Sequence, residues 1–266
     1  MHTCSDKAQL LPGVKPVLEL LLSNPSHIDL VYCKKGLRSR EALEAQRLCR
    51  QHGLRFSLVD QLVLDRLCRD DKGRKAVAHQ GLMARLTMTA FCGLDHLLST
   101  VTEAPLPLLL ALDQVQDPGN VGTLCRTLYT LGGAGLVLPI HNSARLGPAA
   151  HKAAAGALEH LPAAKVTNLG HALDQAEEAG LAIYGTGVAG KPAAAGTLNA
   201  FTEPLRLPAV LVLGNEQKGL RPGVAKRCAH LLHIPQARPL DSFNVAQAGA
   251  ILLGLAAAAQ TRAVDA

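Results

Sequence analysis

Segments whose apolar residues recur every three or four positions alternate with short apolar runs along this chain, which predicts alternating helices and strands. In the first hundred residues, helices are predicted at 13–23, 39–53 and 60–70, and strands at 27–33, 55–59 and 80–88. Gly53 is the residue that ends the second of these helices. We therefore expect a small α/β domain over residues 1–100.

The pattern changes after residues 101–107, a stretch of Pro, Glu and Thr that predicts a linker. The run LPLLLALD at 106–113 is almost wholly apolar, as expected of a strand buried on both faces of a parallel sheet. Further strands are predicted at 134–139, 181–187, 208–214 and 231–235, and helices at 119–133, 147–160, 169–180, 221–231 and 243–260. This alternation predicts an α/β domain with a doubly wound parallel sheet over residues 108–266.

Composition and charge add a difference between the two parts. The chain has 266 residues, and its 48% hydrophobic content is enough for two cores. Residues 1–100 contain 15 Lys and Arg against 10 Asp and Glu, whereas residues 101–266 contain 12 against 11. A basic module joined to a near-neutral one favours a polyanion as partner of the first, although an ordinary soluble surface also explains a surplus of five. With no Trp, three Tyr and four Phe, few side chains could stack on single-stranded bases, so backbone and shape contacts are the favoured means of binding a polyanion.

The seven cysteines are scattered and form no CxxC pair, which argues against a disulfide framework and against a zinc site. We therefore expect a reducing, cytoplasmic setting and no metal. Lys15 and Glu19 interrupt the apolar segment near the start, and the apolar run at 248–259 is too short to span a bilayer. We expect neither a signal peptide nor a membrane role.

A GxGxxG pattern formed by Gly185, Gly187 and Gly190 follows a predicted strand, and alone it would indicate a dinucleotide site. Lys191 and Pro192 stand where a helix should run, and no carboxylate ends the next strand to bind a ribose. A nicotinamide-dependent oxidoreductase is therefore a minor alternative, which a thermal-shift measurement with and without NAD would test.

Three polar segments beside predicted strands are the strongest signals in the chain. In the first, DPGNVGTLCRTL from Asp117, Asn120 is interpreted either as a helix N-cap or as a ligand-binding amide. The N-cap interpretation does not account for Arg126, whose long side chain could reach back toward the helix start to meet a phosphate or hydroxyl.

The second segment, LGNEQKGLRPG from Leu213, follows a buried strand and places the carboxylate of Glu216 at the strand's carboxyl end, where open α/β sheets keep their sites. The third, HIPQARPLDSFNVAQAG from His233, contains Ser242 at a helix start, where an N-cap is the plain interpretation.

Together the three segments resemble the motifs of the TrmH-like ribose methyltransferases of the SPOUT superfamily. The first matching motif is Pro118, Asn120, Gly122 and Arg126; the second is Gly214, Asn215, Glu216, Gly219 and Leu220; the third is Ile234, Pro235, Ser242, Asn244 and Val245. The resemblance covers residues from about 108 to 261. The N-terminal module is similar to the small ribosomal-protein-like RNA-binding domain of many family members, with AHQGLMARL from Ala78 as its closing strand.

The resemblance implies a deep trefoil knot, an S-adenosylmethionine site within it, a homodimer, and an RNA site that draws on both subunits. The residues that would hold the cofactor are Leu213, Gly214, Ile234, Phe243, Thr186 and Gly187. The implied catalytic residues are Arg126, Asn120, Glu216, Ser242 and Asn244. The implied reaction is methyl transfer to a ribose 2′-hydroxyl of structured RNA, with ribosomal RNA favoured over transfer RNA because a separate RNA module is present.

Because a guanidinium stays protonated and is a poor base, our hypothesis is that Arg126 orients the hydroxyl or its phosphate and stabilises developing negative charge. A catalytically silent RNA-binding protein of the same fold is the remaining alternative. It would have little reason to keep these five polar side chains together, and tight RNA binding without cofactor binding would favour it.

Overall fold

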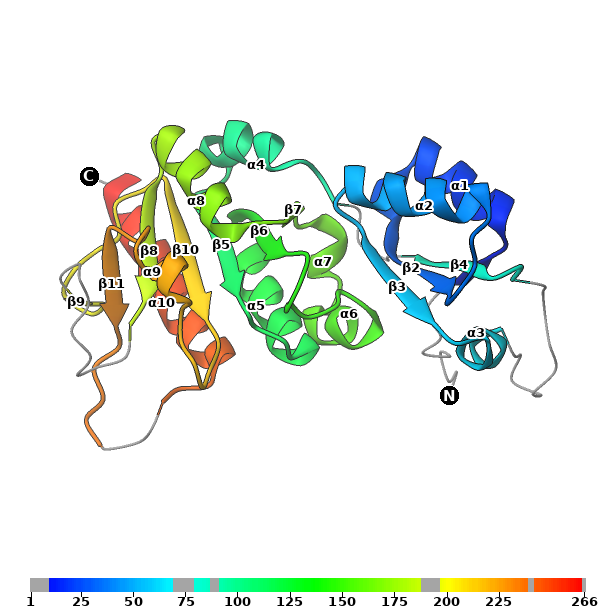
Figure 1. The fold of residues 1–266 in the computed structure, drawn as a ribbon. Helices are drawn as coiled ribbons and strands as arrows, with labels where there is room; N and C mark the ends of the chain where they lie inside the picture. The colour runs from blue at the N-terminus through cyan, green and yellow to red at the C-terminus, as the bar shows by residue number, and fades with distance from the viewer. Residues whose placement is uncertain (1–9, 69–78, 87–90, 188–196, 239–241, 265–266) are drawn as a thin grey trace. The chain divides into compact units, whose positions relative to one another are not determined.

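A computed structural model of the chain describes residues 10–68, 79–86, 91–187, 197–238 and 242–264. The chain forms two compact units, Met1–Ala90 and Phe91–Ala266, and each has its own hydrophobic core (Figure 1). Both units combine helices with a sheet, so the predicted α/β class is confirmed for each.

The first unit contains a four-stranded sheet in the order β1-β4-β2-β3. Its strands are β1 (Leu10–Pro12), β2 (Ile28–Lys34), β3 (Arg55–Val59) and β4 (Leu82–Leu86). β2 and β3 run parallel, and β4 is antiparallel to both β1 and β2. The predicted strands at 27–33 and 55–59 match β2 and β3, and the one at 80–88 contains β4 but ends in residues outside those described. β1 has three residues, too few to show a period in the sequence.

The helices of the first unit are α1 (Val14–Ser23), α2 (Arg40–Gln51) and α3 (Gln61–Leu67), with a 3-10 turn at Pro25–His27. α1 and α2 lie together on one face of the sheet, where Leu21 and Leu48 are buried, and α3 packs on the other through Leu64. Ser39 caps α2, because its hydroxyl accepts a hydrogen bond from the Ala42 amide at 3.2 Å. All three helices lie where the sequence predicted them.

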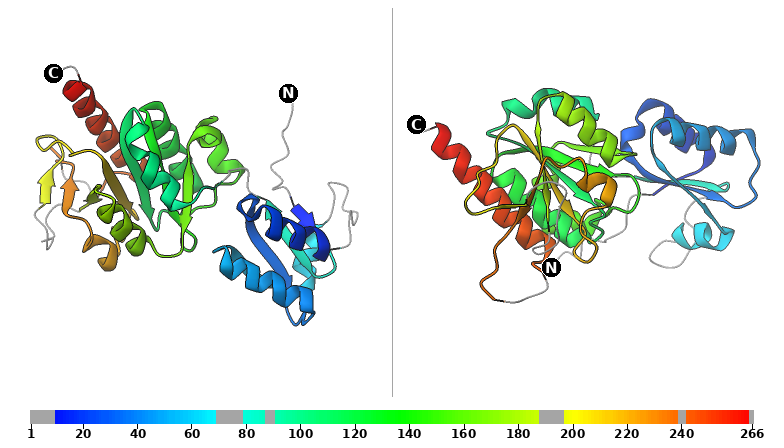
Figure 2. Two further views of the ribbon diagram at one scale, coloured as in Figure 1. Left: turned by 90° about the horizontal axis from the view of Figure 1, so that it is seen from above. Right: turned by 60° about the vertical axis from the view of Figure 1, so that its left-hand side comes forward.

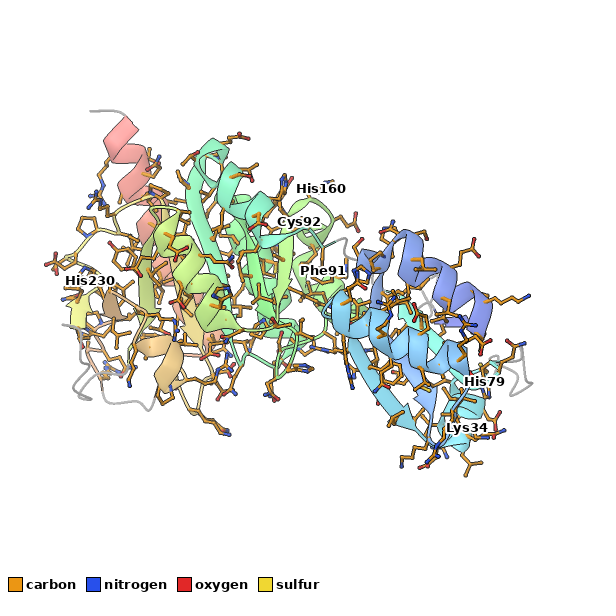
Figure 3. All side chains as sticks on the ribbon, turned by 45° about the horizontal axis from the view of Figure 1, so that its top comes forward. Lys34, His79, Phe91, Cys92, His160 and His230 are labelled. Carbon is orange, nitrogen blue, oxygen red and sulfur yellow. The ribbon has the colours of Figure 1, made fainter. Side chains whose placement is uncertain are left out.

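The second unit begins at Phe91, ten residues before the predicted linker. The Cys92 amide donates to the carbonyl of Ala163, the first residue of β7 (Ala163–Val166), and the Lys165 ammonium lies 4.1 Å from the Phe91 ring centroid. Figure 3 labels Phe91 and Cys92. Leu97 and Val101, further along, are buried in the core of the second unit. The predicted boundary at 101–107 is therefore misplaced, because residues 91–107 bury their apolar side chains in the second unit.

Seven parallel strands form the described sheet of the second unit, in the order β7-β6-β5-β10-β8-β11-β9. They are β5 (Leu106–Asp113), β6 (Gly133–Pro139), β7 (Ala163–Val166), β8 (Ala182–Thr186), β9 (Thr197–Asn199), β10 (Ala209–Gly214) and β11 (His230–His233). The predicted parallel sheet is confirmed. The sequence pattern did not indicate β7 and β9, which have four and three residues.

Helices cover both faces of this sheet (Figure 2). They are α4 (Leu94–Thr100), α5 (Pro118–Thr130), α6 (Pro148–Ala154), α7 (Ala157–His160), α8 (Leu169–Glu178), α9 (Pro222–Ala225) and α10 (Val245–Val264), with a 3-10 turn at Val101–Glu103. Leu108, Leu110 and Leu112 of β5 face the layer of α5 and α10, whereas Leu109 and Ala111 face the layer of α4 and α8. The almost wholly apolar run of β5 thus arises from burial on both faces. Among the described helices, none has both the length and the apolar character of a bilayer-spanning segment.

The helix predicted at 147–160 is two helices. Ala155 and Gly156 both have left-handed backbones, with φ values of 48° and 92°, so the helical hydrogen bonds end there and α7 starts in a new direction. The alanine-rich sequence AAAGALE gives no strong sign of this break, because alanine favours a continuous helix.

Strand order brings the polar segments together. β10 lies between β5 and β8 although β6 to β9 separate it from β5 in sequence, and β11 lies on the other side of β8. The carboxyl ends of β5, β10, β8 and β11 are therefore neighbours at one edge, where open parallel sheets bind ligands. The trefoil knot stays a prediction, because strand order does not describe how the chain passes through its own loops.

Candidate functional site

A pocket of about 220 Å³ lies at the carboxyl ends of β8, β10 and β11. Residues of the second and third polar segments supply most of its wall, together with the end of β8. The residues predicted to hold a cofactor all line it, namely Leu213, Gly214, Ile234, Phe243, Thr186 and Gly187. These six residues, which are up to 57 positions apart in sequence, thus line one cavity.

The β8 side of the pocket is joined to β10 and β11 by hydrogen bonds. The Thr186 hydroxyl accepts from the Gly214 amide at 3.2 Å, and the Gly187 amide donates to the Leu232 carbonyl at 2.8 Å. Gly185, two residues before Gly187, packs so closely against its neighbours that a Cβ there would lie 2.7 Å from the Cys228 sulfur. The GxGxxG pattern therefore combines a packing glycine with a pocket glycine, and Gly190 lies outside the described residues.

The second polar segment forms a tight turn over the end of β10. Asn215 organises this turn, because its side-chain oxygen accepts from the amides of Gln217 at 3.0 Å and Lys218 at 3.1 Å. The Gly219 amide donates back to the Asn215 carbonyl at 2.8 Å. A Cβ on Gly214 would lie 2.5 Å from the Gly219 carbonyl carbon, so the turn itself requires glycine at the position that also lines the pocket.

Asn120 connects all three polar segments. Its side-chain amide donates to the Glu216 carboxylate at 2.8 Å, and its side-chain oxygen accepts from the Asn244 amide at 3.1 Å. Glu216 lines the pocket, so this chain of hydrogen bonds borders the cavity. The structure therefore brings together Asn120, Glu216 and Asn244, as a single site requires.

The helix caps differ from the plain interpretation of the sequence. Asp117 is the N-cap of α5, because its carboxylate accepts from the Asn120 backbone amide at 2.7 Å. The Asn120 side chain is therefore not needed as a cap and makes the contacts with Glu216 and Asn244 instead. At the start of α10, Asn244 accepts from the Ala246 amide at 2.9 Å and takes the capping place that Ser242 was expected to fill. Ser242 lies before the helix, where it is exposed and lines the pocket.

Arg126 stands apart from the other predicted catalytic residues. It is exposed on α5, is not part of the pocket wall, and makes no hydrogen bond or ion pair with the residues that the structure describes. Six residues of helix separate it from Asn120, which corresponds to a rise of about 9 Å and a different side of the helix. The expected return of its guanidinium toward the helix start is not seen within this chain.

An ion pair that the sequence pattern did not indicate holds the pocket loop. Asp113 at the end of β5 is fully buried and accepts from the Arg221 backbone amide at 2.8 Å and from its Nε at 2.6 Å. Asn215 donates to the Gln114 carbonyl at 3.1 Å, so two contacts tie the β5–α5 loop to the β10–α9 loop. The available signal was a carboxylate at the end of an otherwise apolar strand.

His233 was also missed, although it lines the pocket at the end of β11. Its Nδ1 lies 3.0 Å from the Leu198 carbonyl, so Nδ1 carries the proton in that contact and donates it to β9. The contact fixes the ring at the pocket edge.

Burial controls the ionisation of the thiols near the site. It raises the pKa of Cys125 and of Cys228 to about 12, and at Cys228 the negative charge of Asp113 adds to the effect of burial. Neither thiol is therefore suited to nucleophilic chemistry at neutral pH. Among the described residues, no three His, Cys, Asp or Glu side chains gather as a metal site would require, and the absence of a metal stays a prediction.

Residues 107–254 match the sequence profile of the SpoU rRNA Methylase family, and residues 10–91 match the profile described as RNA 2′-O ribose methyltransferase substrate binding. A Mycolicibacterium gilvum protein named as an uncharacterized tRNA/rRNA methyltransferase is 31% identical over 254 residues, which cover 95% of this chain and 77% of the relative. The Bacillus subtilis protein YacO, named as a putative TrmH family tRNA/rRNA methyltransferase, is 28% identical, with 91% of this chain and 92% of the relative covered.

Two solved structures share the fold. The SpoU methyltransferase AviRb from Streptomyces viridochromogenes has a TM-score of 0.57 at 23% identity and covers 96% of this chain and 90% of its own. An rRNA methyltransferase from Sinorhizobium meliloti with bound AdoMet has a TM-score of 0.54 at 23% identity and covers 93% and 85%. At these identities, the likeness concerns the fold.

Proposed function

The chain belongs to the SpoU rRNA Methylase family, and from this we propose that it transfers a methyl group from S-adenosylmethionine to the 2′-hydroxyl of a ribose in structured RNA. The observation that carries the proposal is the position of the pocket. Its wall contains the six residues expected to hold the cofactor, and the Asn120, Glu216 and Asn244 side chains border it.

The pocket wall has a composition that fits S-adenosylmethionine. Leu213, Ile234 and Phe243 supply apolar surface for an adenine ring. Glu216 adds a carboxylate, which favours a positively charged ligand such as a sulfonium. When bound, this cofactor would supply an activated methyl group with a good leaving group.

The chain's own task is then to align a hydroxyl with that methyl group and to accommodate the charge that develops on the oxygen. Among the polar groups in or beside the pocket, Ser242, Asn244 and Glu216 are the ones we propose to hydrogen-bond the ribose. Arg126 would orient the hydroxyl or its phosphate and stabilise negative charge, because a guanidinium cannot take the proton at neutral pH.

We also propose that the active form is a homodimer. Arg126 is exposed and lies outside the pocket of its own chain, which supports a site completed by a second copy. Five of the described cysteines, Cys33, Cys49, Cys92, Cys125 and Cys228, form no disulfide, which supports the cytoplasm as the setting.

For the target we propose ribosomal RNA, with transfer RNA as the alternative that the names of the relatives leave open. Support comes from the separate basic unit, which matches a substrate-binding profile. Mapping ribose 2′-O-methyl groups in total RNA from cells with and without this protein tests the proposal. We expect one site in large-subunit ribosomal RNA to lose its methyl group. A lost transfer RNA site would reassign the target, and unchanged maps would contradict the proposed function.

A further inference from the structure

We propose that one end of the first unit is the surface that holds the RNA, and that it takes a segment with an unpaired base. This inference rests on the proposed function, since it assumes an RNA substrate. The surface, called the basic end below, consists of the loop 34–40, the segment 58–63 and the turn 79–81.

Backbone hydrogen bonds hold these three segments together. β2 and β3 are parallel and both finish at this end, and β4 starts there. The Lys34 amide donates to the Gly81 carbonyl at 2.8 Å, and the Lys35 amide donates to the Val59 carbonyl at 2.9 Å. Figure 3 shows Lys34 and His79 at the same end of the unit.

His79 stabilises the turn from within. Its ring is buried, its Nδ1 accepts from the Gly81 amide at 3.0 Å, and its Nε2 therefore carries the proton and donates to Asp65 of α3 at 3.0 Å. Gly81 has a φ of 84°, and a Cβ there would lie 2.9 Å from the Leu37 side chain. The loop thus has a fixed shape before any ligand arrives, which lowers the entropic cost of binding.

Positive charge is concentrated at this end. The loop carries four cations within seven residues, namely Lys34, Lys35, Arg38 and Arg40. Lys35 pairs with Asp60 at 3.3 Å, but both side chains are more than half exposed, so the pair is weak and the lysine can exchange this partner for a phosphate. Arg38 makes no hydrogen bond or ion pair with the described residues. A polyanion therefore finds several cations ready to contact it.

Apolar side chains stand beside these cations. Leu58 is 56% exposed, Leu62 is 75% exposed and Val63 is 40% exposed. An RNA duplex offers phosphates and hydroxyls in its accessible groove, whereas an unstacked base offers a flat apolar face. Because only 3% of the chain is aromatic, aliphatic side chains take the place of the usual stacking rings. The combination favours a loop or bulge over a continuous duplex.

The opposite end of the same unit provides matched controls. Arg50 is exposed on α2, about 15 Å along the helix axis from Arg40. The first turn of α1 contacts the basic end, because the Val14 amide donates to the Gln80 side chain. Leu22 is 68% exposed in the last turn of the same helix, away from that end. These residues have the same chemistry as those of the basic end but lie outside it.

Filter binding with deproteinised large-subunit ribosomal RNA, measured from low to high KCl, tests the surface. Two full-length variants are compared with wild type: Lys35→Gln/Arg38→Gln/Arg40→Gln and Leu58→Ala/Leu62→Ala. The charge variant is expected to reduce the dependence of log affinity on log salt by roughly 0.7 to 0.9 for each phosphate that the protein no longer neutralises. The leucine variant is expected to weaken binding about tenfold with an unchanged salt dependence. The controls Arg50→Gln and Leu22→Ala are expected to bind close to wild type.

Three results would overturn the inference: wild-type affinity in the charge variant, wild-type affinity in the leucine variant, or equal losses in the controls. A continuous RNA duplex is also tested as a competitor. If it competes as well as RNA with unpaired bases, the proposed preference for an unpaired base would be overturned. S-adenosylmethionine binding measured on the same proteins separates the two proposals. Loss of RNA affinity with cofactor binding intact supports the surface, whereas a wild-type protein that binds RNA here without methylating it would count against the proposed function alone.

Discussion

Asn120 and Glu216, 96 residues apart in sequence, are joined by a 2.8 Å hydrogen bond from the asparagine amide to the carboxylate. The other side of the same amide group accepts from Asn244 at the start of α10. This asparagine therefore fixes the pocket turn and the last helix relative to α5. It acts as a positioning residue even if it never touches the ribose.

Replacing Asn120 with Ala should lower the free energy of unfolding by about 1–3 kcal/mol, because Glu216 and Asn244 each lose a partner. We also expect weaker binding of S-adenosylmethionine, measured by calorimetry. Asn168→Ala is the control: it removes the cap of α8 at a cost of about 1 kcal/mol, far from the pocket. Equal cofactor affinity in the two variants would contradict the positioning role of Asn120.

The Asp113–Arg221 pair should matter more than a surface pair. Arg221→Ala leaves a fully buried carboxylate with one backbone donor, which should cost about 3 kcal/mol in urea unfolding. The matched control is Arg227→Ala, which breaks the 2.6 Å pair with Asp174. Both of these partners are 39% exposed, so this change should cost much less stability than Arg221→Ala. If the two variants lost similar amounts of free energy of unfolding, the burial of Asp113 would not make its pair with Arg221 stronger than a surface pair.

The motif glycine Gly122 has a packing role that can be separated from chemistry. A Cβ there would lie 2.3 Å from the Ala150 carbonyl oxygen of α6, so Gly122→Ala should destabilise the protein by about 1–3 kcal/mol. Gly223→Ala in α9 has open space around the new methyl group and should be neutral or stabilising by up to about 1 kcal/mol. Thermal unfolding of both variants checks the difference, and a neutral Gly122→Ala would refute the close helix contact.

The raised pKa values of two buried thiols lead us to expect that the folded protein loses stability at alkaline pH. Cys125 and Cys228 have folded pKa values raised to about 12, above the ordinary value of 9.0, so the unfolded chain loses these protons first. The contribution of the protonated thiols to the free energy of unfolding is complete below pH 9. It declines between pH 9 and 12 by up to about 1.4 kcal/mol per pH unit for each thiol. Urea unfolding of wild type and of Cys125→Ala/Cys228→Ala measures the slope. The variant should lose stability less steeply, and equal slopes would exclude the thiols as the cause.

The sequence predicted the longer elements and the site more reliably than the connections. β5 and β10 were recognisable because burial on both faces makes them continuously apolar, while β7 and β9 are too short to show a pattern. The domain boundary was placed too late along the chain. Phe91 and Leu97 belong to the second unit through tertiary contacts, which the sequence pattern does not show. The predicted site residues lie in or beside one pocket, except for Arg126, and their roles stay predictions. The caps at Asp117 and Asn244 depend on backbone geometry that several nearby polar residues could equally have supplied.

Arg126 is where sequence and single-chain structure differ most. Arg126→Ala should reduce kcat by at least about a hundredfold, since a charge-stabilising group is lost, while S-adenosylmethionine affinity stays near wild type because the residue lies outside the pocket. Arg126→Lys should recover little, because a lysine does not reproduce the planar fork. Single-turnover kinetics and calorimetry measure the two quantities separately. Loss of cofactor binding in Arg126→Ala would reject this assignment.

The pocket and its polar border are proposed to direct a methyl group to ribose. The most direct measurement incubates the purified chain with RNA and S-adenosylmethionine carrying a deuterated methyl group, then digests the RNA to nucleosides for mass spectrometry. We expect the label on a ribose 2′-oxygen in the wild-type reaction and its loss in Arg126→Ala. Label on a base, or no label in RNA that the protein binds, would contradict it.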